Sequence, residues 1–323
     1  MHLFDPITPR QLWTSTAFAG AVISIPAFTT NGYVLHVLIL AMIFAVFAMS
    51  VNLVIGFSGV KTFGHQAFFG IGAYGSALLS LKLGWSPWLT VWIAALLAAA
   101  IGLLIAIPVL RIRSLAHVAI ITLTFAEIVR ILCVNLKDLT RGEMGLWGIR
   151  PFSSIALGNG LEVHFGPADK VSFYYLAVAL LLTTMVLLEW ITRSRHGLAL
   201  AAMRDAESAA ESLGVGLARH KMMVFFISAL LVGIAGAFYA HYVLLLTPSA
   251  VFGPDLMIQV LAMVLVGGLG TRWGPVIGSF VLTVGIEWLR FLGDYRLLVY
   301  GALIILVMRF FPKGISSLAK LTR

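Results

Sequence analysis

Apolar stretches long enough to cross a lipid bilayer occupy most of this 323-residue chain. The hydrocarbon core of a bilayer is about 30 Å thick, so a helix needs roughly 20 consecutive apolar residues to cross it. Hydrophobic residues make up 60% of the chain and charged residues 11%, whereas soluble domains carry about 25% charged residues. The sequence therefore excludes an ordinary soluble domain and predicts an all-α polytopic membrane protein.

About ten transmembrane helices are predicted within a single domain that covers residues 1–323. The first is expected to be an uncleaved span rather than a signal peptide, because it has no clear small-x-small cleavage site. The predicted spans are residues 12–30, 33–55, 63–82, 88–108, 115–135, 173–192, 222–246, 255–269, 275–292 and 296–311.

The distribution of lysine and arginine predicts the orientation of these spans. If the basic loop 193–221 is cytoplasmic, strict alternation places fourteen Lys and Arg residues inside and seven outside, with Arg130 within a span. Four of the seven lie in the long loop 136–172, and long loops count less in the positive-inside rule. Both termini are therefore predicted to be cytoplasmic and 136–172 periplasmic. Membrane topology explains the net charge of +9 better than nucleic-acid binding does.

A short motif recurs with an offset of 160 residues. Glu127-Ile-Val-Arg130 in the fifth span is echoed by Glu287-Trp-Leu-Arg290 in the ninth. Adding 160 to the residue numbers of the third, fourth and fifth spans gives positions close to the seventh, eighth and ninth spans. Both sets of spans are predicted to cross the membrane in the same direction. The pattern suggests a parallel internal repeat of the kind found in transporters, although apolar segments also align by chance.

Glycines are concentrated in the third span and the loop before it, over residues 56–75. Each glycine costs a helix roughly 1 kcal/mol relative to alanine. Glycine allows either close approach between helices or an unwound stretch whose backbone lines a water-filled path, and the sequence leaves both open. The loop is not a phosphate-binding loop, because Val60 replaces the glycine required before the lysine. The candidates for a translocation path or gate here are Gly64, His65, Gly70 and Gly72.

A second glycine cluster lies between the eighth and ninth spans. Gly267, Gly268 and Gly270 are followed by Gly274-Pro275, a composition typical of a tight turn. Arg272 is predicted to lie on the cytoplasmic side of this turn. The three glycines are either the elements of a simple re-entry of the chain or part of a gate.

Charged residues within predicted spans are candidates for function. Glu127 and Arg130 have i,i+3 spacing on one helix face and can pair, and Glu287 and Arg290 repeat this arrangement. Both pairs are predicted near the outer ends of their spans, where arginine reaches the headgroups. Structural anchoring is therefore favoured over a proton relay.

The sequence offers no pattern typical of a metal or enzyme site. His65, His117 and His241 have no second ligand at i+3 or i+4, and the single cysteine, Cys133, lies within an apolar stretch. One cysteine excludes an intrachain disulfide and a cysteine metal cluster. We expect neither a metal site nor catalytic residues.

The basic loop 193–221 is rich in alanine. Residues 199–213 favour a helix, and Gly214 is expected to end it. Such a helix either docks into a groove on a soluble partner or is an ordinary cytoplasmic loop.

Over residues 35–315 the chain resembles the LivM-type permeases of branched-chain amino acid ABC importers. The stretches that carry the resemblance are NLVIGFSG (52–59), FGHQAFFGIGAY (63–74), ITLTFAEIVR (121–130), residues 197–214 and VGGLGTRWGP (266–275). The resemblance implies that 193–221 is a coupling loop for an ATPase. Serine stands where the family's loop usually has glutamate, and Glu207 or Glu211 is the alternative acidic contact. The implied coupling residues are Ser208, Ala209, Ala210, Glu211 and Gly214.

The resemblance also implies partners in the bacterial inner membrane and on both sides of it. They are a homologous second permease subunit, two ATPase subunits that use the ATP, and an outer substrate-binding protein. The chain itself is expected to bind no cofactor and no nucleic acid, and to contact membrane lipid. Branched-chain amino acids are the expected substrates, with urea or short amides as alternatives. A stand-alone secondary transporter or channel, and a sensor subunit without transport, remain the other classes.

Overall fold

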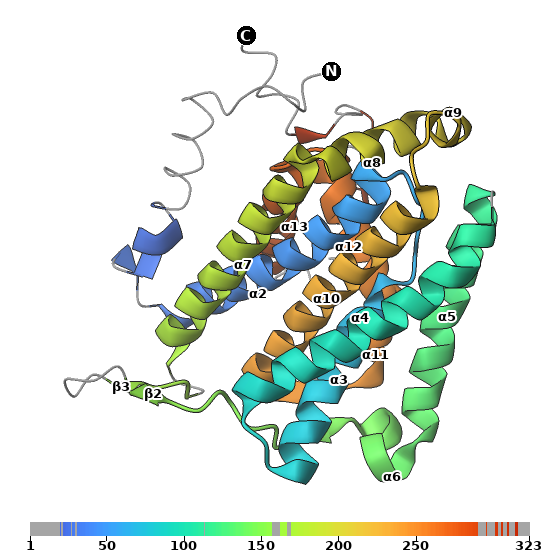
Figure 1. The fold of residues 1–323 in the computed structure, drawn as a ribbon. Coiled ribbons are helices and arrows are strands. Elements are labelled where there is room, and N and C mark those ends of the chain that lie inside the picture. The colour runs from blue at the N-terminus through green and yellow to red at the C-terminus, as the bar shows by residue number, and fades with distance from the viewer. Residues whose placement is uncertain are drawn as a thin grey trace.

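The computed structural model describes residues 31–112, 114–156, 162–166 and 169–289, with residues 20, 22–26, 28–29, 295, 301–302, 305, 309 and 314–315. These residues form a bundle of long helices with a few short strands (Figure 1). The predicted first and last spans, 12–30 and 296–311, lie largely outside the described residues.

The long helices follow the apolar stretches closely. They are α2 (Gly32–Asn52), α3 (His65–Leu83), α4 (Pro87–Arg111), α5 (Leu115–Asn135), α7 (Lys170–Arg193), α10 (Leu217–Val243), α12 (Pro254–Gly267) and α13 (Gly274–Trp288). The short helices are α6 (Lys137–Thr140), α8 (Arg195–Asp205), α9 (Glu207–Ser212), α11 (Pro248–Phe252), a π-helix (Leu53–Phe57) and a 3₁₀-helix (Gly142–Met144). The strands are β1 (Leu146–Trp147), β2 (Ile155–Ala156), β3 (Glu162–Val163) and β4 (Leu245–Leu246).

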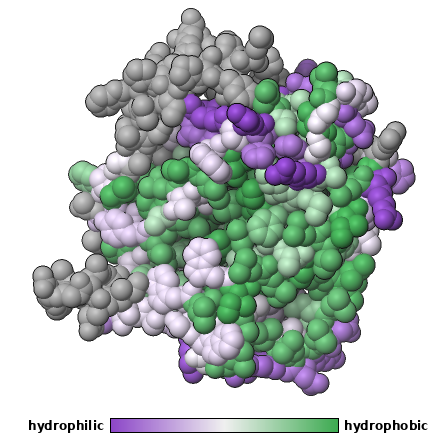
Figure 2. Space-filling model, viewed as in Figure 1, coloured by the Kyte–Doolittle hydropathy of each residue, from purple (hydrophilic) through white to green (hydrophobic). Residues whose placement is uncertain are grey.

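Six helical segments of the described chain are long and apolar enough to cross a membrane: Gly32–Phe57, α4, Ala116–Asn135, α7, α10 and Pro248–Gly267. Helix α13 is apolar but shorter. Helix α3 is less apolar, because glycines, serines, His65 and Gln66 interrupt it. Apolar side chains cover the middle of the visible face in Figure 2, and polar ones gather toward its two ends.

The two loops between spans lie at opposite ends of the bundle. Helices α8 and α9 are at the top of Figure 1, whereas α6 and the strand pair β2–β3 are at the bottom. Strand β1 pairs antiparallel with β4, which directly follows α10, and β2 pairs antiparallel with β3. The segments 193–221 and 136–172 therefore lie at opposite ends of the apolar surface.

Helix α10 lies at the centre of the bundle and packs along α4, α3 and α2. Small residues at these contacts allow the helix backbones to approach one another closely. A Cβ atom added at Gly72 would overlap the backbone of Gly233, and one at Gly236 would overlap the backbone of Phe69. The core between α3 and α10 thus depends on glycine.

The suggested 160-residue repeat matches α3 to α10 and α4 to the segment α11–α12. Helix α3 packs along α4, whereas α12 packs mainly on α13 and α2. The matched helices therefore have different neighbours, and the repeat stays a prediction.

A buried polar network joins α3, α4 and α10 to the segment 136–172. His241 Nδ1 lies 2.7 Å from the carbonyl oxygen of Arg150, and Nε2 lies 2.7 Å from the Ser76 hydroxyl. Because a carbonyl oxygen only accepts, Nδ1 of the neutral ring carries the proton and Nε2 accepts from Ser76. Ser76 Oγ is also 2.8 Å from Thr90 Oγ1. His241 is thus a hydrogen-bonded core residue.

We expect His241→Leu to lower the free energy of unfolding by about 1–3 kcal/mol, because it removes the partner of the Arg150 carbonyl and one of the two partners of the buried Ser76 hydroxyl. Thermal unfolding of the detergent-purified protein measures this loss. His241→Gln retains a donor and an acceptor and should lose less. Equal melting temperatures for His241→Leu and the unmodified chain would contradict the role assigned to the network.

Candidate functional site

The segment between α7 and α10 forms two short helices in place of the single helix predicted over 199–213. Helix α8 begins after Ser194, whose side chain accepts a hydrogen bond from the backbone of His196. The chain becomes extended at Ala206, with φ −158° and ψ 95°, and α9 begins at the next residue. Gly214, with φ +83°, follows α9 and turns the chain toward α10. The single-helix prediction is therefore wrong at Ala206, while the stop at Gly214 is confirmed.

The predicted coupling residues divide into an exposed and a buried set. Ser208, Ala209, Glu211 and Gly214 are exposed. Ala210 is 2% exposed and is part of the hydrophobic core. Helix α9 therefore has one face that packs on the bundle and one face that is open to a partner.

A buried lysine fixes α9 to the start of α10. Lys221 Nζ lies 2.5 Å from Glu207 Oε1, and the lysine side chain is 7% exposed. Losing the carboxylate would leave a buried charge without compensation, which is strongly destabilising. Glu207 is thus engaged within the chain, and of the two alternative acidic contacts Glu211 is the exposed one.

The end of α2 is joined to the turn between α12 and α13. The Asn52 side chain is 2% exposed and uses both ends of its amide. Its Nδ2 donates to the carbonyl of Thr271 at 2.9 Å, and its Oδ1 accepts from the backbone N–H of Gly270 at 2.8 Å. Directly after Asn52 the chain changes from α-helix to the π-helix, a form often found at functional sites.

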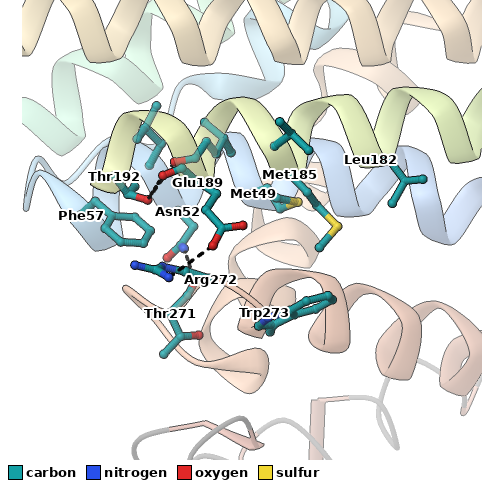
Figure 3. Close-up of a pocket in the computed structure, with 13 residues that line it drawn as sticks. Met49, Asn52, Phe57, Leu182, Met185, Glu189, Thr192, Thr271, Arg272 and Trp273 are labelled. Atoms are coloured by element: carbon teal, nitrogen blue, oxygen red, sulfur yellow. Dashed lines mark hydrogen bonds and ion pairs between the residues drawn. The ribbon is translucent and has the colours of Figure 1, made fainter. Parts of the chain in front are cut away.

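A pocket of about 290 Å³ lies beside this junction, between α2, α7 and the turn at residues 268–273 (Figure 3). Its apolar wall includes Met49, Phe57, Leu182, Met185 and Trp273. Its polar lining includes Asn52, Glu189, Thr192, Thr271 and Arg272. The pocket is thus apolar along α7 and polar at the end that faces the turn.

Charged groups meet at this polar end. Glu189 Oε1 lies 2.8 Å from Arg193 Nη2 and 3.4 Å from Arg272 Nη1. Burial lowers the pKa of the Arg272 guanidinium below its ordinary value, repulsion from Arg193 acts in the same direction, and Glu189 opposes both. Arginine stays protonated under all physiological conditions, so this cluster joins α7 to the turn as charged groups.

The glycine candidates of the third span contact neighbouring helices. The added Cβ would overlap the Thr122 carbonyl at Gly64, the Phe252 ring at Gly70 and the Gly233 backbone at Gly72. His65 is fully buried, with Nε2 at 3.1 Å from the Ser228 hydroxyl. In this structure the three glycines allow close packing between helices, the first of the two alternatives left open by the sequence. Their role in a translocation path stays a prediction.

The second glycine cluster forms the expected turn. Helix α12 ends at Gly267, and Gly268 and Gly270 adopt φ values of +125° and +69°. A Cβ at Gly267 would overlap the backbone of Gly274, so α12 and α13 meet closely. These glycines lie beside the pocket rather than within its lining.

The first predicted ion pair is present. Arg130 Nη2 lies 2.5 Å from Glu127 Oε1, and Arg130 Nε lies 3.0 Å from both carboxylate oxygens. In the second predicted pair, Arg290 lies outside the described residues, and Glu287 accepts a hydrogen bond from Tyr33 at 2.7 Å.

Helix α5, which carries Glu127 and Arg130, is exposed. Only 22% of its most apolar 18-residue window is buried, against 72% in the segment Gly32–Phe57. The side chains of Glu127 and Arg130 are 42% and 29% exposed. Charges are costly against lipid, so this face of α5 is suited to a protein or aqueous environment.

Replacing Arg130 with leucine is expected mainly to lower the yield of folded protein, since it leaves Glu127 unpaired on a spanning helix. Size-exclusion chromatography of the solubilised chain measures the yield, and uptake is normalised to it. Full yield with lost transport would instead assign the pair to the substrate path.

Several residues of this region were not singled out from the sequence. Asn52, Arg204, Lys221 and the π-helix owe their roles to contacts between segments distant in the sequence. An asparagine in an otherwise apolar span was an available signal. Among the described residues, no group of three or more His, Cys, Asp or Glu side chains could hold a metal ion.

Spanning helices, a two-helix segment at one end and glycine turns beside a pocket together define a polytopic helical membrane protein with a surface open to a soluble partner. A family model described as "Branched-chain amino acid transport system / permease component" matches residues 33–308. The chain belongs to this family of permease components, which are membrane subunits rather than enzymes. It is a multi-pass protein of the bacterial inner membrane.

Curated relatives cover nearly the whole chain. The high-affinity branched-chain amino acid transport system permease protein LivM of Escherichia coli K12 is 33% identical over 98% of this chain and 77% of its own length. LivM of Salmonella typhimurium LT2 is 32% identical over the same shares. The permease protein LivH of Salmonella typhimurium is 25% identical over 84% of this chain and 90% of its own length. No solved structure matches the chain.

Proposed function

We propose that this chain is a permease subunit of an ATP-driven importer for branched-chain or other small amino acids. It forms the translocation path together with a homologous second permease subunit. Two ATPase subunits dock on the cytoplasmic side and use the ATP, and a substrate-binding protein delivers the substrate outside. The chain binds no cofactor of its own.

The observation that carries the proposal is the segment formed by α8 and α9. It lies at one end of the bundle, presents Ser208, Ala209 and Glu211, and is fixed to α10 by the pair Glu207–Lys221. A fixed helix with an exposed face is suited to receive a force from a soluble partner. The similarity to both LivM and LivH supports a pair of related permease subunits.

The proposed topology has ten spans and both termini in the cytoplasm. Six segments meet the length and apolarity of a span. Helices α3 and α13, which do not meet both, are two further spans of the proposal. The stretches 12–30 and 296–311 supply the other two. The loop 136–172 is then periplasmic and the loop 193–221 cytoplasmic, which is consistent with their places at opposite ends of the bundle.

Purification of the tagged chain from its native host in mild detergent, followed by mass spectrometry, tests the proposal. Two ATPases and a related permease are the expected companions. A chain that purifies alone and still transports after reconstitution would be a self-sufficient carrier or channel instead. Competition of labelled leucine uptake by isoleucine, valine, urea and acetamide then identifies the substrate class.

A further inference from the structure

Arg204, in the last turn of α8, contacts both glycine-rich segments of the cytoplasmic end. Its Nη1 lies 3.2 Å from the carbonyl oxygen of Gly56 in the π-helix. A Cβ atom at Gly59 would lie 3.0 Å from Cα of Arg204, and one at Gly270 would lie 3.3 Å from its Nη1. The arginine therefore packs along the loop after the π-helix and reaches the turn between α12 and α13.

The geometry of the π-helix explains why the Gly56 carbonyl is free to accept a hydrogen bond from Arg204. The backbone N–H of Ser58 bonds to the carbonyl of Leu53, five residues earlier, and the chain turns at Gly59 with φ +77°. Carbonyls in the last turn of a helix have no partner within the helix. The Arg204 guanidinium supplies a charged donor to one of them, a bond stronger than one between neutral groups.

The residue directly before the π-helix, Asn52, bonds to the 268–273 turn. The carboxamide of Asn52 bonds to the backbone of Gly270 and Thr271, as described above. Gly56 fits between these groups only because it has no side chain, since a Cβ there would overlap the Asn52 amide and the Gly270 backbone. Arg204, Gly56, Asn52 and Gly270 thus form one continuous set of contacts, here called the Arg204 link.

We propose that Arg204 is a positioning residue that transmits displacement of α8 to the π-helix and to the 268–273 turn. The inference rests on the proposed function, because an ATPase must move α8. A displacement of α8 then shifts the end of α2 and the junction of α12 and α13 together, since Asn52 bonds the two. The pocket beside Asn52 changes shape with them. Energetic coupling between sites is carried by packed and hydrogen-bonded contacts of this kind.

The test uses the complete transporter, with its permease partner, ATPases and binding protein, reconstituted into liposomes. Arg204→Gln removes the charge and the reach of the guanidinium. We expect this variant to retain its ATPase subunits and its ATP hydrolysis. The number of substrate molecules moved per ATP should fall by about fivefold or more, the low end of typical coupling between sites.

Two further variants separate the link from a merely structural role. Arg204→Lys keeps a charged donor. Its number of substrate molecules moved per ATP should lie between those of Arg204→Gln and the unmodified chain. Asn52→Asp keeps the acceptor for Gly270 but loses the donor to Thr271, and it should lower the same ratio even if Arg204→Gln fails to fold. Combined with Arg204→Gln it should add little, because both changes interrupt one set of contacts. Arg111→Gln, an exposed cation at the end of α4, is the matched control.

The outcomes are distinguishable. An unmodified chain that does not copurify with ATPases would overturn the proposed function, and this inference with it. Copurification with an unchanged transport ratio in Arg204→Gln and Asn52→Asp would overturn the inference alone. Loss of the ATPases from Arg204→Gln would make Arg204 a docking residue, which also contradicts it.

Discussion

Replacing Ala210 with aspartate is expected to abolish uptake while the amount of chain in the membrane stays close to normal. Ala210 is on the buried face of α9, and burying a carboxylate without a partner costs several kcal/mol. Each step of about 1.4 kcal/mol against the docked form of α9 shifts the equilibrium between its docked and undocked forms tenfold. The spanning helices do not depend on this position, so insertion should persist.

Uptake of labelled substrate, normalised to the membrane level of the chain by immunoblotting, measures this effect. Ala210→Ser is the matched control, because a small hydroxyl can bond to a carbonyl of its own helix. Gly214→Val should also lower uptake. Its effect would come from backbone strain, because Gly214 has a φ of +83° that a side chain disfavours. A steric clash is not the cause, because an added Cβ meets no described atom within 4 Å. Normal uptake in Ala210→Asp and Gly214→Val would remove the coupling role of α9.

The second large effect is expected at the contact between α3 and α10. Gly72→Val should eliminate most of the folded protein, because the new side chain would occupy the space of the Gly233 backbone. Overpacking against side chains typically costs about 1–3 kcal/mol, and a backbone yields less than a side chain. The monodisperse fraction in size-exclusion chromatography should therefore fall sharply.

Gly285→Val makes the same substitution in another apolar helix, α13, at a position where an added Cβ meets no described atom within 4 Å. Its folded yield should stay near that of the unmodified chain. Equal yields for Gly72→Val and Gly285→Val would show that the α3–α10 contact tolerates separation.

The sequence was sufficient to predict most of the helices, because length and apolarity determine a span almost alone. The apolar stretch 88–108 became α4, and 222–246 became α10 with an earlier start at Leu217. It did not predict the break at Ala206, since every residue from 199 to 205 and from 207 to 212 is compatible with a helix. We attribute this break to tertiary contacts on its two sides. Glu207 pairs with Lys221 of α10, whereas Arg204 bonds to the Gly56 carbonyl of the π-helix.

The candidate site was predicted only in part. The turn at Gly267–Gly270 and the pair Glu127–Arg130 follow from local spacing, and both are present. The pocket could not be predicted, because it brings together α2, α7 and residues 271–273, which are separated from one another by more than seventy residues. Local patterns carry no information about contacts at such separations.

Helix α10 runs without a break from one end of the bundle to the other. It has 27 residues, which corresponds to about 40 Å at 1.5 Å per residue. Its C-terminal end is bonded to the segment 136–172 through His241 and through β4, and its N-terminal end is bonded to α9 through Lys221. In the proposed importer, a binding protein that tilts α10 from one end would therefore also move α9 at the other end, and the tilt of a single helix would be enough to carry a signal across the bilayer.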